Sequence, residues 1–154
     1  KPAVKVKNAK GKVLTSADYT VIYASGRKNV GSYTVTVKMK GNYSGSFTKT
    51  FRILPKGTKF TSVKAAKKSF TAKWSAQKTQ TTGYQLQYTT DKKFEKSVKT
   101  VTTSKNTVVK TTVKKLAAKK TYYVRIRTYK TVKINGKNTK LYSGWTTAKK
   151  VKTK

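Results

Sequence analysis

The chain has 154 residues, of which 38 are lysine or arginine and only three are acidic, giving a formal net charge of +35. It contains no cysteine and no histidine, which excludes disulfides, thiolate nucleophiles, zinc–thiolate sites and imidazole bases or metal ligands. Aromatic residues make up 11% of the chain, whereas disordered basic tails contain few of them, so we expect a packed core. No apolar run approaches the ~18 residues that cross a bilayer, so no membrane insertion is expected. The chain opens within a strand-like segment and is expected to be a fragment of a longer protein.

The few acidic residues leave little room for catalysis. Asp18, Asp91 and Glu95 are too few for a carboxylate cage around a hard cation. A glycosidase pair would have to be Asp91 and Glu95, but we prefer to interpret Asp91 as a turn residue and Glu95 as a local partner for lysines. A lysine nucleophile is chemically possible, yet nothing distinguishes one lysine from another. We therefore expect no enzyme, no catalytic residue, no cofactor and no metal.

Alternation of apolar and polar residues with a period of two runs through the whole chain, which predicts strands and no long helix. In the first third the expected strands cover residues 3–7, 18–24, 32–40 and 46–53. Turn-forming sequences such as "SGRKNVG" and "GNYSG" separate them. Pro55 and Gly57 then interrupt the pattern in "LPKGT". The sequence therefore predicts a first domain at 1–54, a short, stiff linker at 55–57 and a second domain at 58–154.

The second domain alternates more strongly. Residues 121–127 place Tyr122, Val124 and Ile126 on one face, with Tyr123, Arg125 and Arg127 on the other. Asn135-Gly136 is the strongest short hairpin signal in the chain. About seven strands with turns between them predict a sandwich of two β-sheets. The expected fold class is thus all-β, with β-sandwich domains in tandem.

Several motifs in residues 58–154 resemble the fibronectin type III family. They are Phe70-x-x-x-Trp74, the alternating "GYQLQY" at 83–88, and Leu116 followed six residues later by Tyr122. The resemblance implies a seven-stranded sandwich and a tyrosine corner, in which the hydroxyl of Tyr122 bonds back to nearby backbone. The corner loop is "AAKK" here, where the family often has Pro-Gly. The core residues that the resemblance and the alternation imply are Trp74, Tyr84, Leu86, Leu116, Tyr122 and Val124.

The first third, "DYTVIYASGRKNVGSYTVTVKMKGNYSGSFTKTFRI", is similar to the Ig-like repeats of surface and secreted proteins in Gram-positive bacteria, especially gut Firmicutes. Those repeats usually carry an earlier strand before the segment that matches "KPAVKVK". The domain at 1–54 is therefore expected to be a partial Ig-like domain that lacks its first strand. Lysine-rich fibronectin modules ending in "VKTK" commonly follow such repeats. The resemblance implies an extracellular location, at the cell surface or secreted.

The stretch "LAAKKTYYVRIRTYK" at 116–130 combines aromatic and basic residues, as strands that bind single-stranded nucleic acid do. A core strand with a basic outer face is the preferred interpretation. Only Tyr123 and Tyr129 would then remain for stacking on bases. Lysine outnumbers arginine 34 to 4, and lysine supplies a diffuse positive field rather than geometric recognition of phosphate. Nucleic acid is therefore expected to bind only non-specifically.

Two functions remain open at this point. The first is a non-catalytic module that acts as a stiff spacer between other domains of its parent protein and adheres electrostatically to anionic cell-wall polymers such as teichoic acid. The alternative is an adhesin module that binds a carbohydrate or host ligand. Its candidate ligand-facing residues are Tyr129, Tyr142, Trp145, Arg125 and Arg127. In the simpler interpretation Trp145 packs on the sheet edge and the tyrosines cover lysine stems.

Gram-positive sandwich domains sometimes contain a Lys–Asn isopeptide crosslink promoted by a buried acid. Asp18 is the one acid in the first third, and Asn29 or Asn42 with a core lysine would be its partners. The preferred interpretation treats these residues as ordinary loop and turn positions.

Overall fold

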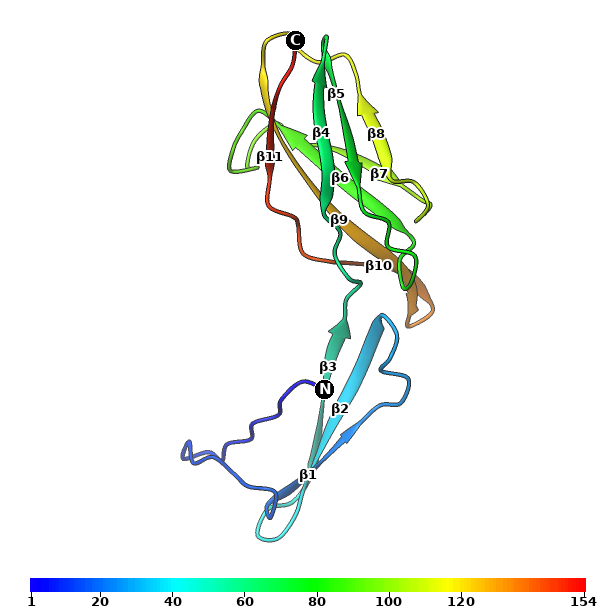
Figure 1. The fold of residues 1–154 in the computed structure, drawn as a ribbon. Helices are drawn as coiled ribbons and strands as arrows, with labels where there is room; N and C mark the ends of the chain where they lie inside the picture. Colours follow the sequence, from blue (N-terminus) through cyan, green and yellow to red (C-terminus); the bar gives the residue numbers. More distant parts are fainter. The chain divides into compact units, whose positions relative to one another are not determined.

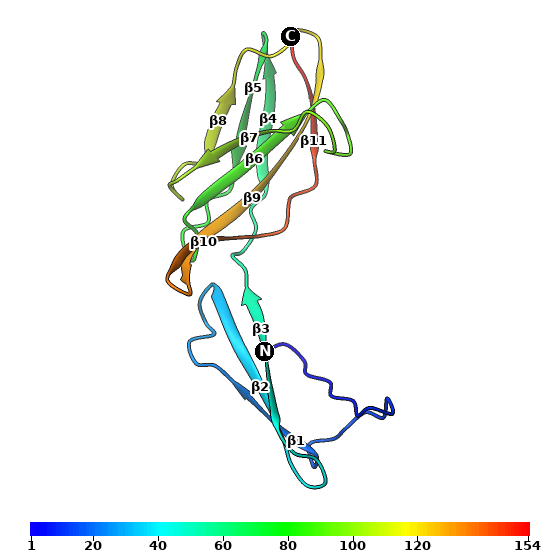
Figure 2. The same cartoon turned by 180° about the vertical axis from the view of Figure 1, so that it is seen from behind.

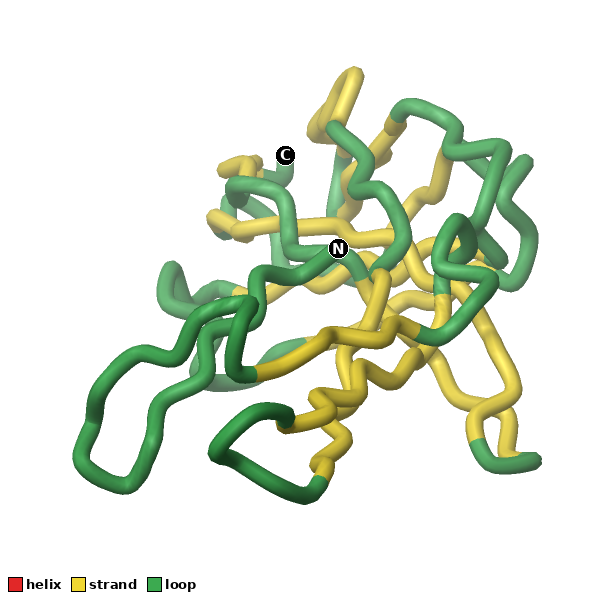
Figure 3. Tube along the Cα trace, turned by 90° about the horizontal axis from the view of Figure 1, so that it is seen from below, coloured by secondary structure: helices red, strands yellow, loops and turns green.

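The computed structural model describes residues 1–154. It is all-β, as the alternation predicts, and contains eleven strands. Figure 3 shows strands and connecting loops without a helix. Accordingly, there is no helix that is long and apolar enough to span a membrane. The chain divides into two compact units, Lys1–Ile53 and Leu54–Lys154, which are called unit 1 and unit 2 below.

Unit 1 contains one antiparallel sheet of three strands in the order β1-β2-β3 (Figure 1). These strands are β1 (Tyr19–Tyr23), β2 (Gly31–Met39) and β3 (Ser46–Ile53). The chain before β1 forms a short hairpin, in which Lys7 bridges Val13 and the N–H of Leu14 donates to the carbonyl of Val6 over 2.9 Å. This hairpin packs on one face of the sheet and buries Val6 and Leu14 against Val37 of β2. The strand expected at 3–7 is thus reduced to a single bridge.

Unit 2 is a sandwich of two antiparallel sheets, seen from opposite sides in Figures 1 and 2. The smaller sheet contains β4 (Phe60–Ala66), β5 (Ser69–Trp74) and β8 (Lys110–Val113). The larger sheet contains β6 (Gly83–Thr89), β7 (Lys99–Thr103), β9 (Thr121–Ile134), β10 (Lys137–Tyr142) and β11 (Lys149–Lys152). Its order is β10-β9-β6-β7, and β11 pairs with the first half of β9 while β10 pairs with the second. The last predicted strand is thus split into β10 and β11.

The space between the two sheets is filled by the inward side chains of the alternating strands. All six expected core residues lie in this buried cluster: Trp74, Tyr84, Leu86, Leu116, Tyr122 and Val124. The hydroxyl of Tyr122 accepts a hydrogen bond from the N–H of Ala117 over 3.2 Å. The bond back to nearby backbone that the resemblance implied therefore forms here, although the loop reads "AAKK".

One local feature, the hairpin between β9 and β10, was predicted from the sequence, and another, strand β4, was not. Asn135 and Gly136 form the expected hairpin between β9 and β10, with φ angles of 49° and 77°, as a type I′ turn requires. Strand β4 was not predicted, because its register shifts between Phe60 and Ser62. Such a bulge breaks the period of two on which the sequence reading depends.

Residues 55–57, expected as a linker, belong to the body of unit 2. Pro55 is buried. The carbonyl of Lys56 accepts a hydrogen bond from the hydroxyl of Thr128 over 2.8 Å, and Gly57 packs near Ser143. Thr128, the hydrogen-bond partner of this segment, lies 72 residues further along the chain. The local sequence therefore shows only the strand-breaking Pro55 and Gly57, which are typical of a linker.

Candidate functional site

Strand β9 carries the candidate site on its outer face. Because side chains alternate along a strand, Val124 and Ile126 enter the core while Arg125 and Arg127 point away from it. The register of β6 against β9 places Gln87 opposite Arg125 and Gln85 opposite Arg127.

Each glutamine holds the arginine opposite it through two hydrogen bonds. The Nε and one terminal N–H group of Arg125 donate to the Oε1 atom of Gln87 over 3.0 and 2.8 Å. Arg127 does the same with Gln85, over 2.9 and 2.6 Å. Both guanidiniums are therefore fixed in position against β6.

The segment between β10 and β11 brings Trp145 over the same face. Ser143 and Thr146 accept through their hydroxyls from the N–H groups of Thr128 and Ile126, over 3.0 and 3.1 Å. Their own N–H groups donate to the carbonyls of the same two residues, over 3.1 and 2.9 Å. Hydroxyls thus replace backbone carbonyls as acceptors, and the chain stays attached to β9 while it bulges at Gly144 and Trp145.

The result is a stack of alternating rings and guanidiniums, which we call the arginine–aromatic stack. Its order is Phe94, Arg125, Trp145, Arg127 and Tyr142. The Cζ atom of Arg125 lies 4.1 Å from the ring centroid of Phe94 and 4.5 Å from that of Trp145. The Cζ atom of Arg127 lies 4.1 Å from Trp145 and 3.8 Å from Tyr142. Arginines two positions apart on a strand are separated by about 6.6 Å, which leaves room for one ring between them.

The stack also affects the two arginines electrostatically. Burial lowers the pKa of Arg125 below its ordinary value. Burial is also the main cause of the lowered pKa of Arg127, while Tyr142 raises that pKa and Arg125 lowers it. The rings contribute cation–π attraction that offsets part of this cost of desolvation.

Phe94, at one end of the stack, is positioned by Asp91. The Asp91 carboxylate accepts from the N–H groups of Lys93, Glu95 and Lys96 over 2.9, 2.8 and 3.0 Å. These three bonds hold the pKa of Asp91 below its ordinary value. They also stabilise a turn in which Phe94 has a φ of 59°, an uncommon conformation for an aromatic residue. Asp91 is therefore engaged as a turn residue, which agrees with the preferred interpretation.

Tyr129 was expected to face a ligand, but the structure buries it against the outer face of the larger sheet, where the residue has a relative exposure of 2%. Its partner in the register is Gly83, so no side chain on β6 keeps the ring away from the sheet. The hydroxyl of Tyr129 reaches across β6 and donates to the carbonyl of Thr103 over 3.0 Å. The other four candidates, Tyr142, Trp145, Arg125 and Arg127, all lie in the arginine–aromatic stack.

Sequence reasoning missed Phe94, Gln85 and Gln87. Phe94 lies in a loop far along the chain from Arg125, and nothing in its neighbourhood signals a contact. The glutamines alternate with Tyr84, Leu86 and Tyr88, so the strand pattern places them on the outer face. Only the register with β9 makes them partners of the arginines.

The chemistry of the stack is that of recognition and support, since it contains no nucleophile and no acid–base pair. Each guanidinium has five N–H donors and uses two of them on glutamine, so the others remain for an anion at its edge. The indole of Trp145 lies between two guanidiniums, so its faces are not open for stacking on a sugar ring. The chain contains no group of three His, Cys, Asp or Glu residues suited to a metal.

Asp18 lies at the surface of unit 1. Its Oδ2 atom accepts from the N–H and the hydroxyl of Thr15 over 2.9 and 3.1 Å. The bond from the backbone of Thr15 is the largest cause of its lowered pKa. This carboxylate is not the buried acid that an isopeptide crosslink needs.

The lysines form the second functional feature, a positive surface over both units. Every lysine is exposed except Lys130, which is half-buried. On the outer face of the smaller sheet, Lys73 of β5 lies directly opposite Lys110 of β8. Like charges in this arrangement destabilise a sheet, and three acids cannot neutralise 38 basic side chains.

The comparisons with known proteins concern mainly unit 2. Comparison with curated proteins finds no matching relative. Among solved structures, the chain is similar to the FN1–FN3 domains of chicken CNTN1, with 17% identity and a TM-score of 0.52 over 81% of this chain and 43% of that one. It is also similar to a segment of two fibronectin type III domains from chicken tenascin, with 20% identity and a TM-score of 0.51 over 80% of this chain and 66% of that one. The chain thus spans less than two thirds of either structure.

The sequence model of the fibronectin type III domain matches residues 53–143, more than half of the 154 residues. Domains of this family are typically non-catalytic structural or binding modules and are often extracellular. Two packed antiparallel sheets, the core around Trp74 and the hydrogen bond of Tyr122 to the corner loop agree with that match. The chain belongs to the fibronectin type III family.

Proposed function

We propose that the chain is a non-catalytic module of a surface or secreted protein of a Gram-positive bacterium. It serves as a spacer between other domains and adheres electrostatically to anionic cell-wall polymers such as teichoic acid. The observation that carries the proposal is the lysine surface: the charge of +35 is delivered almost entirely by exposed lysines. A polymer with one phosphate per repeat is the kind of partner that a dispersed positive surface suits.

Two of the four arginines are only partly available to such a partner. Arg125 and Arg127 are held by glutamine and by rings in the arginine–aromatic stack. Bidentate, geometrically selective binding of phosphate favours arginine. The exposed lysines instead act as hydrated point charges, so binding depends on the density of phosphate rather than on its arrangement.

Such binding has a defined dependence on salt. A protein that neutralises phosphates releases condensed counterions, so its affinity falls steeply as salt concentration rises. At ~0.1 M salt, charges further apart than about 10 Å are largely screened from one another. We therefore expect binding to Gram-positive cell walls at low salt that is lost as salt is raised.

The test is sedimentation of the whole chain with purified Gram-positive cell walls, with and without teichoic acid, over a series of salt concentrations. Binding that falls with salt and disappears on stripped walls is expected. Binding that survives both high salt and stripping would overturn electrostatic adhesion and indicate a specific glycan site. Absence of binding at low salt would refute the adhesive role.

Two variants separate the lysine surface from the stack. The triple variant Lys64→Gln, Lys73→Gln, Lys110→Gln removes three exposed charges from one sheet face and should weaken binding and reduce the salt slope. Trp145→Phe alters the stack without changing charge and should leave binding unchanged. The opposite pattern would assign adhesion to the arginine–aromatic stack.

A further inference from the structure

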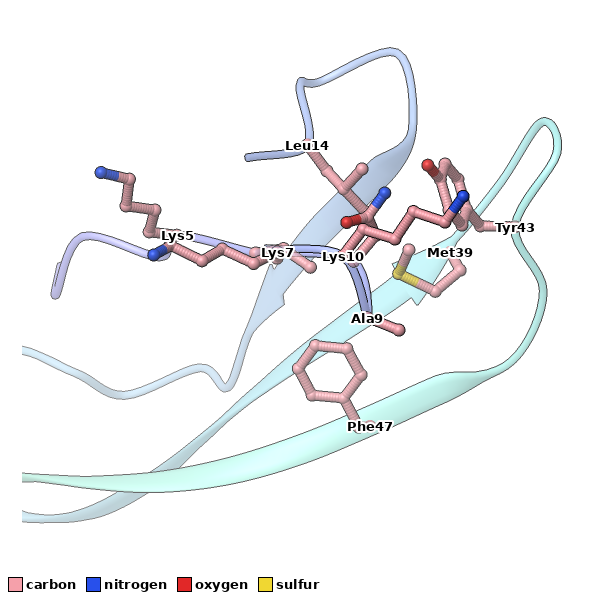
Figure 4. A pocket seen from close by; sticks show the side chains of 10 residues that line it. Lys5, Lys7, Ala9, Lys10, Leu14, Met39, Tyr43 and Phe47 are labelled. Carbon is pink, nitrogen blue, oxygen red and sulfur yellow. The ribbon is translucent and has the colours of Figure 1, made fainter. Parts of the chain in front are cut away.

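Unit 1 contains an open groove of about 610 Å³ between its N-terminal hairpin and its sheet (Figure 4). The hairpin side is formed by residues 5–10, and the sheet side by Met39 of β2, Tyr43 and Phe47 of β3. Leu14, which is buried, also lines the groove. The lining is mostly apolar, with lysine side chains at the rim, as the labelled Lys5, Lys7 and Lys10 show in Figure 4.

The groove exists because the hairpin covers only part of the apolar face of the sheet. Val37 of β2 is buried beneath it, with 2% of its side chain exposed. Its neighbour in the register, Phe47 of the edge strand β3, points to the same face but is 43% exposed. Phe47 continues the apolar lining formed by Met39 and Tyr43, and a contiguous apolar surface rimmed by polar groups is typical of a contact surface.

The hairpin also presents an unused backbone edge at the groove. Residues 6–8 pair with residues 12–14 on one side, through the bridge of Lys7 to Val13 and the N–H of Asn8 donating to the carbonyl of Lys12 over 3.0 Å. No strand pairs with residues 5–7 on the other side, where the groove lies. An extended chain placed there would find both backbone hydrogen-bonding groups and an apolar floor.

We propose that this groove binds an extended polypeptide segment in which apolar and acidic side chains alternate. Successive side chains of a strand point to opposite sides, so its apolar residues would cover Phe47 and Met39 while its acidic residues face the lysines. The segment acts as a third strand of the layer begun by the hairpin.

Charge decides between this occupant and a second copy of the chain. Unit 1 has eleven basic side chains and one acidic side chain, a net charge of +10. Two copies would bring lysines against lysines in the groove, which like-charge repulsion opposes. An acidic partner strand removes that repulsion and adds complementary pairs at the rim.

The test is an NMR titration of the whole chain with a short capped peptide of alternating valine and glutamate. We expect chemical-shift changes at residues 5–10 and at Phe47, with slower amide exchange along 5–7. A peptide of alternating valine and lysine should not bind. A polyglutamate peptide of equal charge should cause no chemical-shift changes in the groove, because it lacks apolar side chains.

Phe47→Ser is the diagnostic variant, and we expect it to weaken binding by about tenfold, as loss of a buried ring implies. Ile22→Ser is its matched control, since Ile22 is 52% exposed on β1 and lies on the opposite face of the same sheet. It should leave the affinity unchanged. Both side chains are at the surface, so both variants are expected to fold, and their NMR spectra report it.

Three results would overturn the proposal. Equal affinity for polyglutamate, with shifts spread over the lysine surface, would mean that only charge is recognised. Equal weakening by Phe47→Ser and Ile22→Ser would place the peptide elsewhere. Shifts in the groove with micelles of an anionic lipid, but none with the peptide, would assign the groove to an acyl chain.

Discussion

Tyr129 of β9 lies directly opposite Gly83 of β6, and its ring covers the position where Gly83 has no side chain. The hydroxyl of Tyr129 extends beyond β6 to the carbonyl of Thr103 on β7. One glycine therefore allows a single tyrosine to connect three neighbouring strands of the larger sheet. This arrangement removes Tyr129 from the surface and makes Gly83 a position that tolerates no side chain.

Gly83→Ala should destabilise unit 2 by about 3 kcal/mol, the upper end of the range for overpacking. A Cβ atom at this position would overlap the carbonyl of Thr103 and press on the hydroxyl of Tyr129, and the obstacle is backbone rather than a flexible side chain. Urea denaturation measures the loss. Gly144→Ala is the control, because a Cβ there meets nothing within 4 Å. Equal effects of the two substitutions would show that the contact around Gly83 is not restrictive.

Trp145→Ala should destabilise unit 2 by about 1–3 kcal/mol, because the indole contacts two guanidiniums and each cation–π contact contributes about 0.5–1 kcal/mol. A double-mutant cycle with Arg127→Gln should give a coupling energy of at least about 0.5 kcal/mol. The same cycle made with Tyr123→Ala should give none, since Tyr123 lies four positions from Arg127 along β9. A cycle without coupling between Trp145 and Arg127 would contradict the stack.

The loop that carries Phe94 should lose its structure in acid. The folded-state pKa of Asp91 lies below its ordinary value, so the carboxylate stabilises the folded state above the unfolded pKa. That stabilisation is lost as the pH falls through the folded pKa. We expect the amides of Lys93, Glu95 and Lys96 to lose protection from exchange, relative to the intrinsic rate at each pH, at the acidic end of a titration.

Asp91→Ala provides the comparison for this titration. It should lower the protection of these amides at neutral pH and abolish its further loss in acid. Glu95→Gln, an exposed neighbour whose side chain is not needed by the turn, should leave both unchanged. An acid response that persists in Asp91→Ala would locate the titrating group elsewhere.

Lys73→Glu should stabilise unit 2 by about 0.2–1 kcal/mol, because it converts a like-charge pair with Lys110 into an opposite pair across neighbouring strands. Thermal unfolding at low salt measures the gain. Lys133→Glu makes the same change in net charge opposite an uncharged residue, Asn138, and should stabilise less. The difference between the variants should shrink with added salt, which screens exposed pairs. A larger gain for Lys133→Glu would attribute the effect to net charge alone.

The wild-type chain should also become more stable as salt rises from low to moderate concentration. The chain has 38 basic side chains and only three acidic ones, so most lysines have no acidic neighbour and repel each other. Added salt screens that repulsion. Calorimetry at several salt concentrations measures the melting temperature. A melting temperature that does not respond to salt would show that the lysines are too far apart to repel.

The amino-acid sequence by itself determined the class of fold and the core of unit 2. Period-two alternation put Trp74, Tyr84 and Val124 on the inner faces of strands, where they are buried. Asn135-Gly136 specified its hairpin, because two positive φ angles in succession suit few other residue pairs. These features depend on the residues themselves and on their near neighbours, so a linear pattern is enough to reveal them.

The tertiary structure decided which of those residues meet. The arginine–aromatic stack takes Phe94 from a loop, the two arginines from β9 and Trp145 from the segment after β10. Tyr129 has the same alternation as Arg127 but is buried, because its neighbour on β6 is Gly83. The register between β6 and β9 pairs glutamines and arginines that lie 38 and 42 residues apart in the chain. It depends on how the whole core packs, and no local pattern contains it.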